Sequence, residues 1–188
     1  MKLALIRHGQ TDWNREFRLQ GSSDIPLNDT GREQARQAVE LLSTSEWDVI
    51  VSSPLGRARE TAQIIADGLG LKLGPAYDLL IERDYGDAEG ATEEVIAKRW
   101  PDREYPGLES VHSVGDRGAR ALEQIAADFG DARVIIVTHG TLIRVTLDKI
   151  SGLTFPSISN AAISTVEKNG DSWRVLSVNG EPLEALAV

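Results

Sequence analysis

The 188-residue sequence contains no cysteine, only one methionine and only three histidines. Without cysteine the chain can form no disulfide, thiolate zinc site or iron–sulfur cluster, and it has no thiol nucleophile. The three histidines, His8, His112 and His139, lack the HxxxH or HxxEH spacing of zinc enzymes. The serine elbow and the Walker A loop are missing too. We therefore expect neither a metal ion nor another cofactor.

Basic residues are also in short supply, with 20 Lys and Arg against 29 Asp and Glu, which gives a net charge of −9. Because binding to a phosphate backbone needs a basic face, this balance argues against a nucleic-acid partner. The sequence has no run of 18 apolar residues, and Arg7 interrupts the N-terminal segment too early for a secretory signal. We therefore expect a cytoplasmic protein that does not bind a membrane, in which any anion site needs a local cluster of Arg and His.

The length predicts one domain over residues 1–188. Three short apolar runs, 2–6, 48–51 and 133–137, are typical of buried parallel strands. Near the end, residues 162–166 and 173–178 flank an Asn-Gly turn signal and predict an antiparallel pair. Helical patterns separate the strands. These patterns indicate an α/β three-layer sandwich with a mostly parallel central sheet, flanking helices and an antiparallel C-terminal strand pair.

Four segments have helical spacing of apolar residues: 30–42, 54–69, 114–129 and 141–150. The residues Thr30 to Glu33 predict a capping box at the start of the first segment, and Pro54 fits the first position of the second helix. The stretch from Tyr77 to His112 is irregular and predicts a long loop over one end of the sheet, where α/β proteins often carry function.

Similar polar residues follow each of the three buried strands: Arg7-His8-Gly9, Ser52 to Arg57, and Thr138-His139-Gly140. Ligands bind beyond the carboxyl ends of parallel strands, so two histidines and two arginines should converge there. Arginine forms bidentate hydrogen bonds to phosphate, helix N-termini after Pro54 and Gly140 would add N–H donors, and imidazole is an effective nucleophile. This combination favours a phosphoryl-transfer site. His112 has no such context and is expected to be an ordinary residue.

Five ordered blocks then identify a family resemblance. They are Arg7 to Asn14, which fits R-H-G-x-T-x-x-N; Leu19-Gln20-Gly21 with Asp24, Pro26, Leu27, Thr30 and Gly31; Ser52 to Ala62; Glu82 to Gly90; and Val137 to Gly140. Together they resemble the histidine phosphatase (phosphoglycerate mutase-like) superfamily, and the chain looks like a short, phosphatase-type member of it.

The resemblance implies a role for each matching residue. His8 would be the nucleophile that is phosphorylated on Nε2, and Glu82 would be the general acid, with a raised pKa. Arg7, Arg57 and His139 would complete the catalytic set by holding the phosphoryl oxygens. The residues expected to bind substrate are Arg7, Asn14, Gln20, Gly21, Arg57, His139 and Gly140. Further candidates to line the pocket are Arg83, Tyr85, Trp100 and Leu108.

The chain departs from the family pattern in two places. Many phosphatase relatives carry P-G-G-E-S near the lid, whereas this chain has Pro106-Gly107-Leu108-Glu109-Ser110, so the role of Leu108, Glu109 and Ser110 stays open. Mutases usually have a longer insertion and a longer tail, but here the tail ends at Val188. A short lid leaves phosphohistidine open to water, which favours hydrolysis.

The main expectation is therefore a metal-independent phosphomonoester hydrolase that acts on a small phosphorylated metabolite through phosphohistidine. The first alternative is a phosphoglycerate mutase primed by a bisphosphoglycerate, with the same residues. The second is a non-catalytic binder of phosphorylated ligands, against which the filled catalytic positions count. The motifs do not name the substrate, and a homodimer is possible because relatives often pair.

Overall fold

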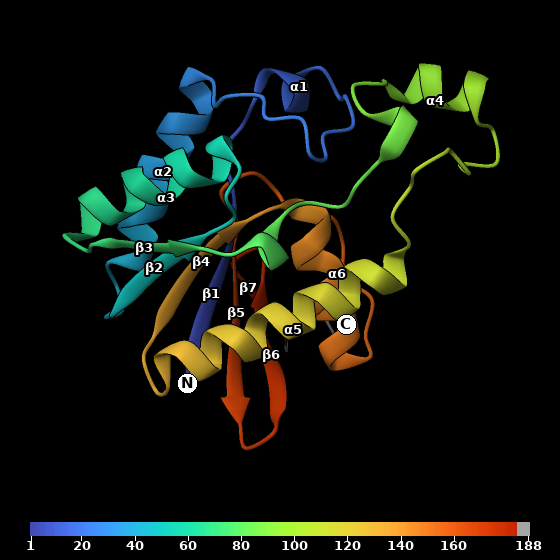
Figure 1. Cartoon of the computed structure of the whole chain (residues 1–188). Helices are drawn as coiled ribbons and strands as arrows, with labels where there is room; N and C mark the ends of the chain where they lie inside the picture. The colour runs from blue at the N-terminus through green and yellow to red at the C-terminus, as the bar shows by residue number, and fades with distance from the viewer. Residues whose placement is uncertain (184–188) are drawn as a thin grey trace.

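A computed structural model describes residues 1–183, arranged around a single seven-stranded sheet (Figure 1). Across the sheet the strands follow the order β3-β2-β4-β1-β5-β6-β7. Their bounds are β1 (Lys2–Arg7), β2 (Val49–Ser52), β3 (Leu73–Ala76), β4 (Val134–Thr138), β5 (Ile163–Asn169), β6 (Ser172–Val178) and β7 (Glu181–Pro182). Strands β1 to β4 are parallel to one another, whereas β5 pairs antiparallel with β1, β6 with β5 and β7 with β6. The predicted mixed sheet is confirmed.

The helices cover both faces of this sheet. The α-helices are α1 (Asp12–Arg15), α2 (Asp29–Leu42), α3 (Gly56–Leu69), α4 (Glu93–Arg99), α5 (Val111–Phe129) and α6 (Gly140–Ser151), and the short 3₁₀ turns are η1 (Asp78–Leu80) and η2 (Gly86–Ala88). Residues 1–183 include no helix long and apolar enough to cross a membrane.

The pleat of β1 shows how the three layers are built. Leu3 and Leu5 point to one face and join the apolar cluster that includes α5 and α6. Ala4 and Ile6 point to the other face and pack with residues of α2 and α3. Because side chains alternate along a strand, a continuous apolar run can bury both faces of the sheet. The carboxyl ends of the parallel strands are thereby left as the free edge where a site can form.

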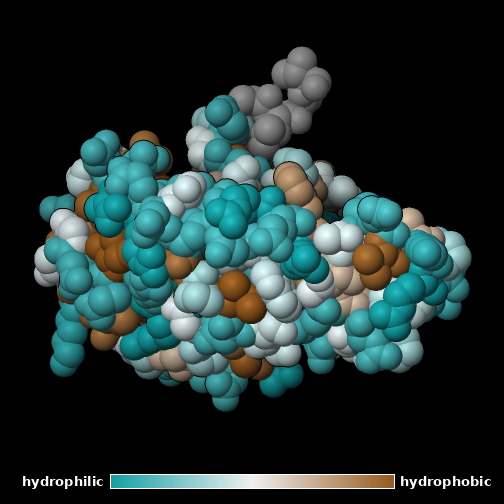
Figure 2. Space-filling model, turned by 90° about the horizontal axis from the view of Figure 1, so that it is seen from above, coloured by the Kyte–Doolittle hydropathy of each residue, from teal (hydrophilic) through white to brown (hydrophobic). Residues whose placement is uncertain are grey.

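Helices α1 and α4 lie at that end of the molecule, α1 above the strands and α4 further to the right in the view (Figure 1). A view onto the same end shows a mostly hydrophilic surface on which apolar residues form small separate patches (Figure 2). The segment expected to be one long loop, from Tyr77 to His112, contains η1, η2, α4 and the first residues of α5. The sequence did not predict α4, because this helix is only seven residues long and has one buried apolar residue, Ile96.

Three details differ from the predicted elements. Helix α2 is capped by Asn28, whose side chain accepts from the backbone N–H of Gly31 at 2.9 Å, so the predicted capping box at Thr30 is wrong. Pro54 is not the first helical residue, because α3 begins at Gly56 with Leu55 as N-cap. Strands β3 and β7 were not predicted. The C-terminal residues 184–188, on which the short-tail argument depends, lie outside the described part of the chain.

Candidate active site

The ends of β1 and β4 bring the two predicted site histidines together. Arg7 pairs with Thr138 in the parallel register of these strands, and the His8 N–H donates to the Thr138 carbonyl at 2.9 Å. The rings of His8 and His139 consequently lie 5.2 Å apart, edge to face. The third histidine, His112, belongs to α5. Its side chain is exposed and pairs with Asp116.

His8 is held in one tautomer. Its Nδ1 lies 2.7 Å from the Gly9 carbonyl oxygen, which can only accept, so Nδ1 carries the proton and Nε2 keeps its lone pair. Arg57 Nε donates to this Nε2 across 3.3 Å. Burial, with help from the positive charges of Arg57 and Arg7, lowers the pKa of His8 well below its ordinary value. The imidazole is therefore neutral near pH 7, as a nucleophile must be.

The backbone that follows His8 is packed against the start of α2 without room for a side chain. A Cβ on Gly9 would lie 2.3 Å from the Gly31 carbonyl oxygen, and a Cβ on Gly31 would lie 2.2 Å from the Gln10 carbonyl oxygen. The Gly9 N–H also donates to Thr61 Oγ1 at 3.1 Å. The two main chains can approach this closely only because neither residue has a side chain.

Arg57 is completely buried, which a charged side chain tolerates only when its donors are satisfied. Its Nη2 donates to the Gly21 carbonyl at 2.7 Å and its Nη1 to the Ser23 carbonyl at 2.8 Å. Burial lowers its pKa to about 10, so the guanidinium stays charged at neutral pH. Gly21, predicted to bind substrate, contributes a carbonyl that holds Arg57 and is not part of the cavity wall.

Glu89 holds the loop that supplies these carbonyls. Its carboxylate accepts from the backbone N–H of Ser22 at 2.6 Å and of Ser23 at 3.0 Å. These hydrogen bonds, together with those from the serine hydroxyls, leave the pKa of Glu89 below its ordinary value although its partial burial acts the other way. Glu89 thus positions Arg57 through the loop. The sequence placed Glu89 in a motif block but could not indicate this contact.

Three buried polar atoms have no hydrogen-bond partner among the described residues: Arg7 Nε, His139 Nδ1 and Gln20 Nε2. Buried polar groups are otherwise satisfied in folded proteins, so such atoms mark places where a ligand or water completes the structure. Arg7 is anchored by Nη1, which donates to the Ile158 carbonyl at 2.7 Å. His139 Nε2 lies 2.8 Å from Ser53 Oγ, and burial lowers its pKa well below the ordinary value.

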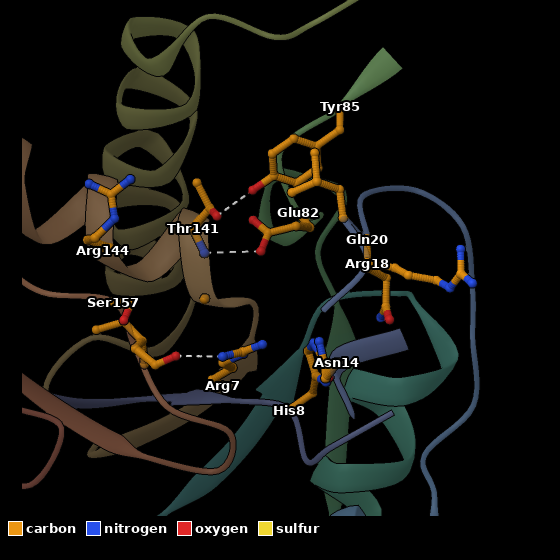
Figure 3. A pocket seen from close by; sticks show the side chains of 13 residues that line it. Arg7, His8, Asn14, Arg18, Gln20, Glu82, Tyr85, Thr141, Arg144 and Ser157 are labelled. Carbon is orange, nitrogen blue, oxygen red and sulfur yellow. Dashed lines mark hydrogen bonds between the residues drawn. The ribbon is translucent and has the colours of Figure 1, made fainter. Parts of the chain in front are cut away.

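Glu82 is fixed to the first turn of α6. Its Oε2 accepts from the Thr141 N–H at 3.0 Å (Figure 3). Its Oε1 accepts from the backbone N–H groups of Leu142 at 3.0 Å and of Arg83 at 2.8 Å. Burial nevertheless raises the pKa of this carboxyl above its ordinary value, against the lowering effect of these N–H groups and of Arg7. The expected raised pKa of Glu82 therefore agrees with its surroundings.

These contacts correct one expectation about helix N-termini. The Thr141 and Leu142 N–H groups at the start of α6 donate to Glu82, and the Gly56 N–H at the start of α3 donates to Asp24 at 2.7 Å. Because nearby carboxylates occupy these three N–H groups, they are not available to a phosphate, whereas Gly140 itself lines the cavity.

A cavity of about 170 Å³ opens above His8. Its lining residues are Arg7, His8, Asn14, Arg18, Leu19, Gln20, Glu82, Tyr85, Gly140, Thr141, Arg144, Ser157 and Ile158 (Figure 3). Asn14 has its side-chain oxygen engaged by the Thr11 N–H at 3.0 Å, which leaves its amide N–H₂ for the cavity. Arg57 is outside the lining, although its Nε reaches His8 Nε2, and the candidates Arg83, Trp100 and Leu108 are outside it too. Arg18, Arg144, Ser157 and Ile158 were missed because no motif marks them.

The sequence left the roles of Glu109 and Ser110 open, and in the structure Glu109 supports the segment that carries Glu82. Glu109 pairs with Arg117 at 3.0 Å, and Arg117 donates to the carbonyls of Leu79 at 2.9 Å and of Ile81 at 2.5 Å. Ser110 is the N-cap of α5 and accepts from the backbone N–H of Ser113. Glu109 thus braces the Glu82 loop against α5 from outside the cavity, and Ser110 caps that helix.

Comparison with known proteins gives a consistent result. The model of the Histidine phosphatase superfamily (branch 1) matches residues 3–181. An "Uncharacterized phosphatase PhoE" of Bacillus subtilis is 41% identical over 94% of this chain and 93% of its own length. "Phosphoglycerate mutase-like protein 4" of Arabidopsis thaliana is 35% identical, and the match covers 93% of this chain and 83% of that protein. The structure of a mycobacterial glucosyl-3-phosphoglycerate phosphatase solved with VO3 matches with a TM-score of 0.86 at 30% identity. The match covers 95% of this chain and 98% of that chain.

Proposed function

The chain belongs to the histidine phosphatase superfamily, and on that premise we propose that it is a metal-independent phosphomonoesterase that forms phosphohistidine on His8. The observation that carries the proposal is the neutral imidazole of His8, whose unprotonated Nε2 accepts from Arg57 Nε, with the positive charge of Arg7 also nearby. The phosphatase relatives support the same conclusion. We further propose that the whole chain, 1–188, is one catalytic domain.

The geometry suggests two chemical steps. His8 Nε2 attacks the phosphorus, the bond from phosphorus to the ester oxygen breaks, and the Glu82 proton passes to the leaving oxygen. Water then attacks the phosphorus of phosphohistidine, Glu82 takes a proton from that water, and neutral His8 and inorganic phosphate are released. Arg7 and Arg57 stabilise the charge on the phosphoryl oxygens in both steps.

A phosphate-release assay distinguishes the proposed phosphatase from a mutase. We expect 3-phosphoglycerate incubated with the enzyme and EDTA to release inorganic phosphate, with no requirement for a bisphosphoglycerate primer. Interconversion of 2- and 3-phosphoglycerate without phosphate release would support the mutase, whose name several relatives carry. Binding of phosphate esters without turnover on any of a panel of them would support a non-catalytic binder.

The pH dependence of the first step should separate the two catalytic groups. The pKa of His8 is lowered below 6.5, so protonation should reduce the phosphorylation rate only well below pH 6.5, for every substrate. The pKa of Glu82 is raised above 4.5, and its deprotonation at higher pH should slow alkyl phosphates only. Single-turnover rates for an alkyl phosphate and p-nitrophenyl phosphate would show this. If the phosphorylation rate falls equally for both substrates at alkaline pH, the prediction for Glu82 is wrong.

Arg117 is expected to be a positioning residue for Glu82. Replacing Arg117 by Gln removes its bonds to the Leu79 and Ile81 carbonyls and leaves Glu109 without its cation, so kcat on alkyl phosphates should fall about 10-fold or more. Arg117→Lys should restore part of this loss, and p-nitrophenyl phosphate should be affected less. Arg120→Gln, an exposed change on the same helix, is the control. Equal losses on both substrates would indicate a structural role alone.

A further inference from the structure

The α6 wall of the cavity carries a guanidinium that the proposed chemistry leaves unused. Arg144 follows Thr141 by three residues, so the two side chains lie on one side of α6, about 4.5 Å apart along its axis. Figure 3 shows Arg144 and Ser157 on the wall opposite Gln20 and Arg18. Within residues 1–183 the Arg144 guanidinium has one partner, Asp148, with 3.2 Å between Nη1 and Oδ2. Its Nε and Nη2 can therefore donate to a bound molecule.

The cavity is basic although the protein is acidic. Three arginines line it against a single carboxylate, that of Glu82, in a chain of net charge −9. Arg7 is committed to the phosphoryl group. Arg18 uses its Nε for Glu16 and its Nη1 for the Gly90 carbonyl, at 2.7 and 2.8 Å. Arg144 is therefore the lining guanidinium that has the most free donors and no assigned task.

The position of Glu82 shows which part of a substrate faces Arg144. Glu82 has to lie next to the leaving oxygen in order to protonate it, and its Oε2 is bonded to the Thr141 N–H. The leaving alcohol therefore occupies the space beside the first turn of α6. A substituent close to the ester oxygen would then extend along α6 toward Arg144, one turn further on.

We propose that Arg144 binds a carboxylate on the leaving alcohol, so that the preferred substrates are phosphomonoesters of small hydroxy acids. This inference rests on the proposed phosphatase function. A carboxylate can accept two parallel hydrogen bonds from the Arg144 guanidinium. It carries a single negative charge, which one arginine with free donors can balance. A second phosphate carries nearly two charges and would need more cations than this wall supplies. The small volume of the cavity also favours the smaller group.

The test uses two substrates that differ only at this group: 3-phosphoglycerate has a carboxylate where glycerol 3-phosphate has a hydroxymethyl group. We expect kcat/KM of the unmodified enzyme to be at least about 10-fold higher for 3-phosphoglycerate. Arg144→Gln should reduce this ratio about 10-fold, mainly by raising KM for 3-phosphoglycerate. Arg144→Lys should recover part of the ratio, because Lys keeps the positive charge but cannot form the two parallel hydrogen bonds of a guanidinium.

Two variants act as controls. Asp148→Asn removes the partner charge but keeps Arg144 and can still accept from the Phe155 N–H, so it should keep or increase the preference for the carboxylate. Arg36→Gln removes an exposed arginine paired with Glu33 on α2 and should leave the ratio unchanged. An equal ratio in Arg144→Gln and the unmodified enzyme, or equal losses on both substrates, would overturn the inference. Failure to hydrolyse either substrate, with no phosphoenzyme formed, would instead overturn the proposed function.

Discussion

Replacing His8 by Ala is expected to lower kcat for every phosphate ester by at least about 10⁴-fold and to abolish phosphoenzyme formation. The reason is that no other imidazole is among the described residues of the lining, and protonated hydroxyl groups are weak nucleophiles. His139, the nearest imidazole, has its Nε2 at 2.8 Å from Ser53 Oγ, and the described chain contains no cysteine or lysine in the lining. Acid-labile, base-stable labelling by a ³²P-labelled ester, followed alongside phosphate release in EDTA, measures both effects.

His112→Ala is the matched control, since this histidine is exposed on α5 and contacts Asp116. It should keep full activity and full labelling. Arg7 and Arg57 remain in His8→Ala, so the inactive variant should still bind phosphate esters, which calorimetry can detect. Activity within 10-fold of the unmodified enzyme, or labelling that survives the substitution, would remove His8 from the nucleophile role.

Replacing Glu82 by Gln is expected to have the second-largest effect, a loss of about 10²–10⁴-fold in kcat on an alkyl phosphate. An alkoxide is a poor leaving group and needs the proton that Gln cannot give. With p-nitrophenyl phosphate the phenolate leaves unaided, so His8 should still be phosphorylated. Loss of the base then slows hydrolysis of phosphohistidine. Rapid-mixing experiments should therefore show a burst of about one p-nitrophenolate per active site, followed by slow turnover.

Glu89→Gln provides the comparison for this leaving-group effect. Glu89 acts on the loop that holds Arg57. Its loss should therefore slow the reactions of alkyl phosphates and of p-nitrophenyl phosphate by the same factor and give no burst. Glu82→Gln should also lower the melting temperature, because an amide nitrogen in place of either Glu82 oxygen would face a backbone N–H. If Glu82→Gln behaves like Glu89→Gln on the two substrates, the acid role passes to another group.

The parts of the fold that the sequence predicts well are those with a strong local signal. The three buried strands carry continuous apolar runs, and the residues at their ends meet because the strands are parallel. Strand β3 escaped prediction since its sequence, Leu73-Gly74-Pro75-Ala76, combines two strand-breaking residues at the sheet edge. The cap at Asn28 was missed because Asn28 and Thr30 both satisfy the local rule, and packing decides between them.

The site shows the same division. Motif spacing and strand ends indicate His8, Arg57 and His139, and the structure brings them together. The supports of these residues come from contacts between distant segments, such as Arg117 with the loop before Glu82, 36 residues away from Ile81. Such a pair leaves no periodicity or motif in a single sequence. Arg144 was missed for another reason: on a helix, a cavity-lining arginine and a solvent-exposed one have the same local pattern.

The glycine contact between Gly9 and Gly31 has a consequence for how mutational surveys of this protein would be interpreted. Any side chain at either position would collide with a main-chain carbonyl, which cannot move aside as a flexible side chain can. A saturation survey scored on catalysis should therefore rank positions 9 and 31 beside the residues that handle the phosphoryl group. A reader of that ranking alone would assign them to chemistry, whereas their contribution is the space they leave empty.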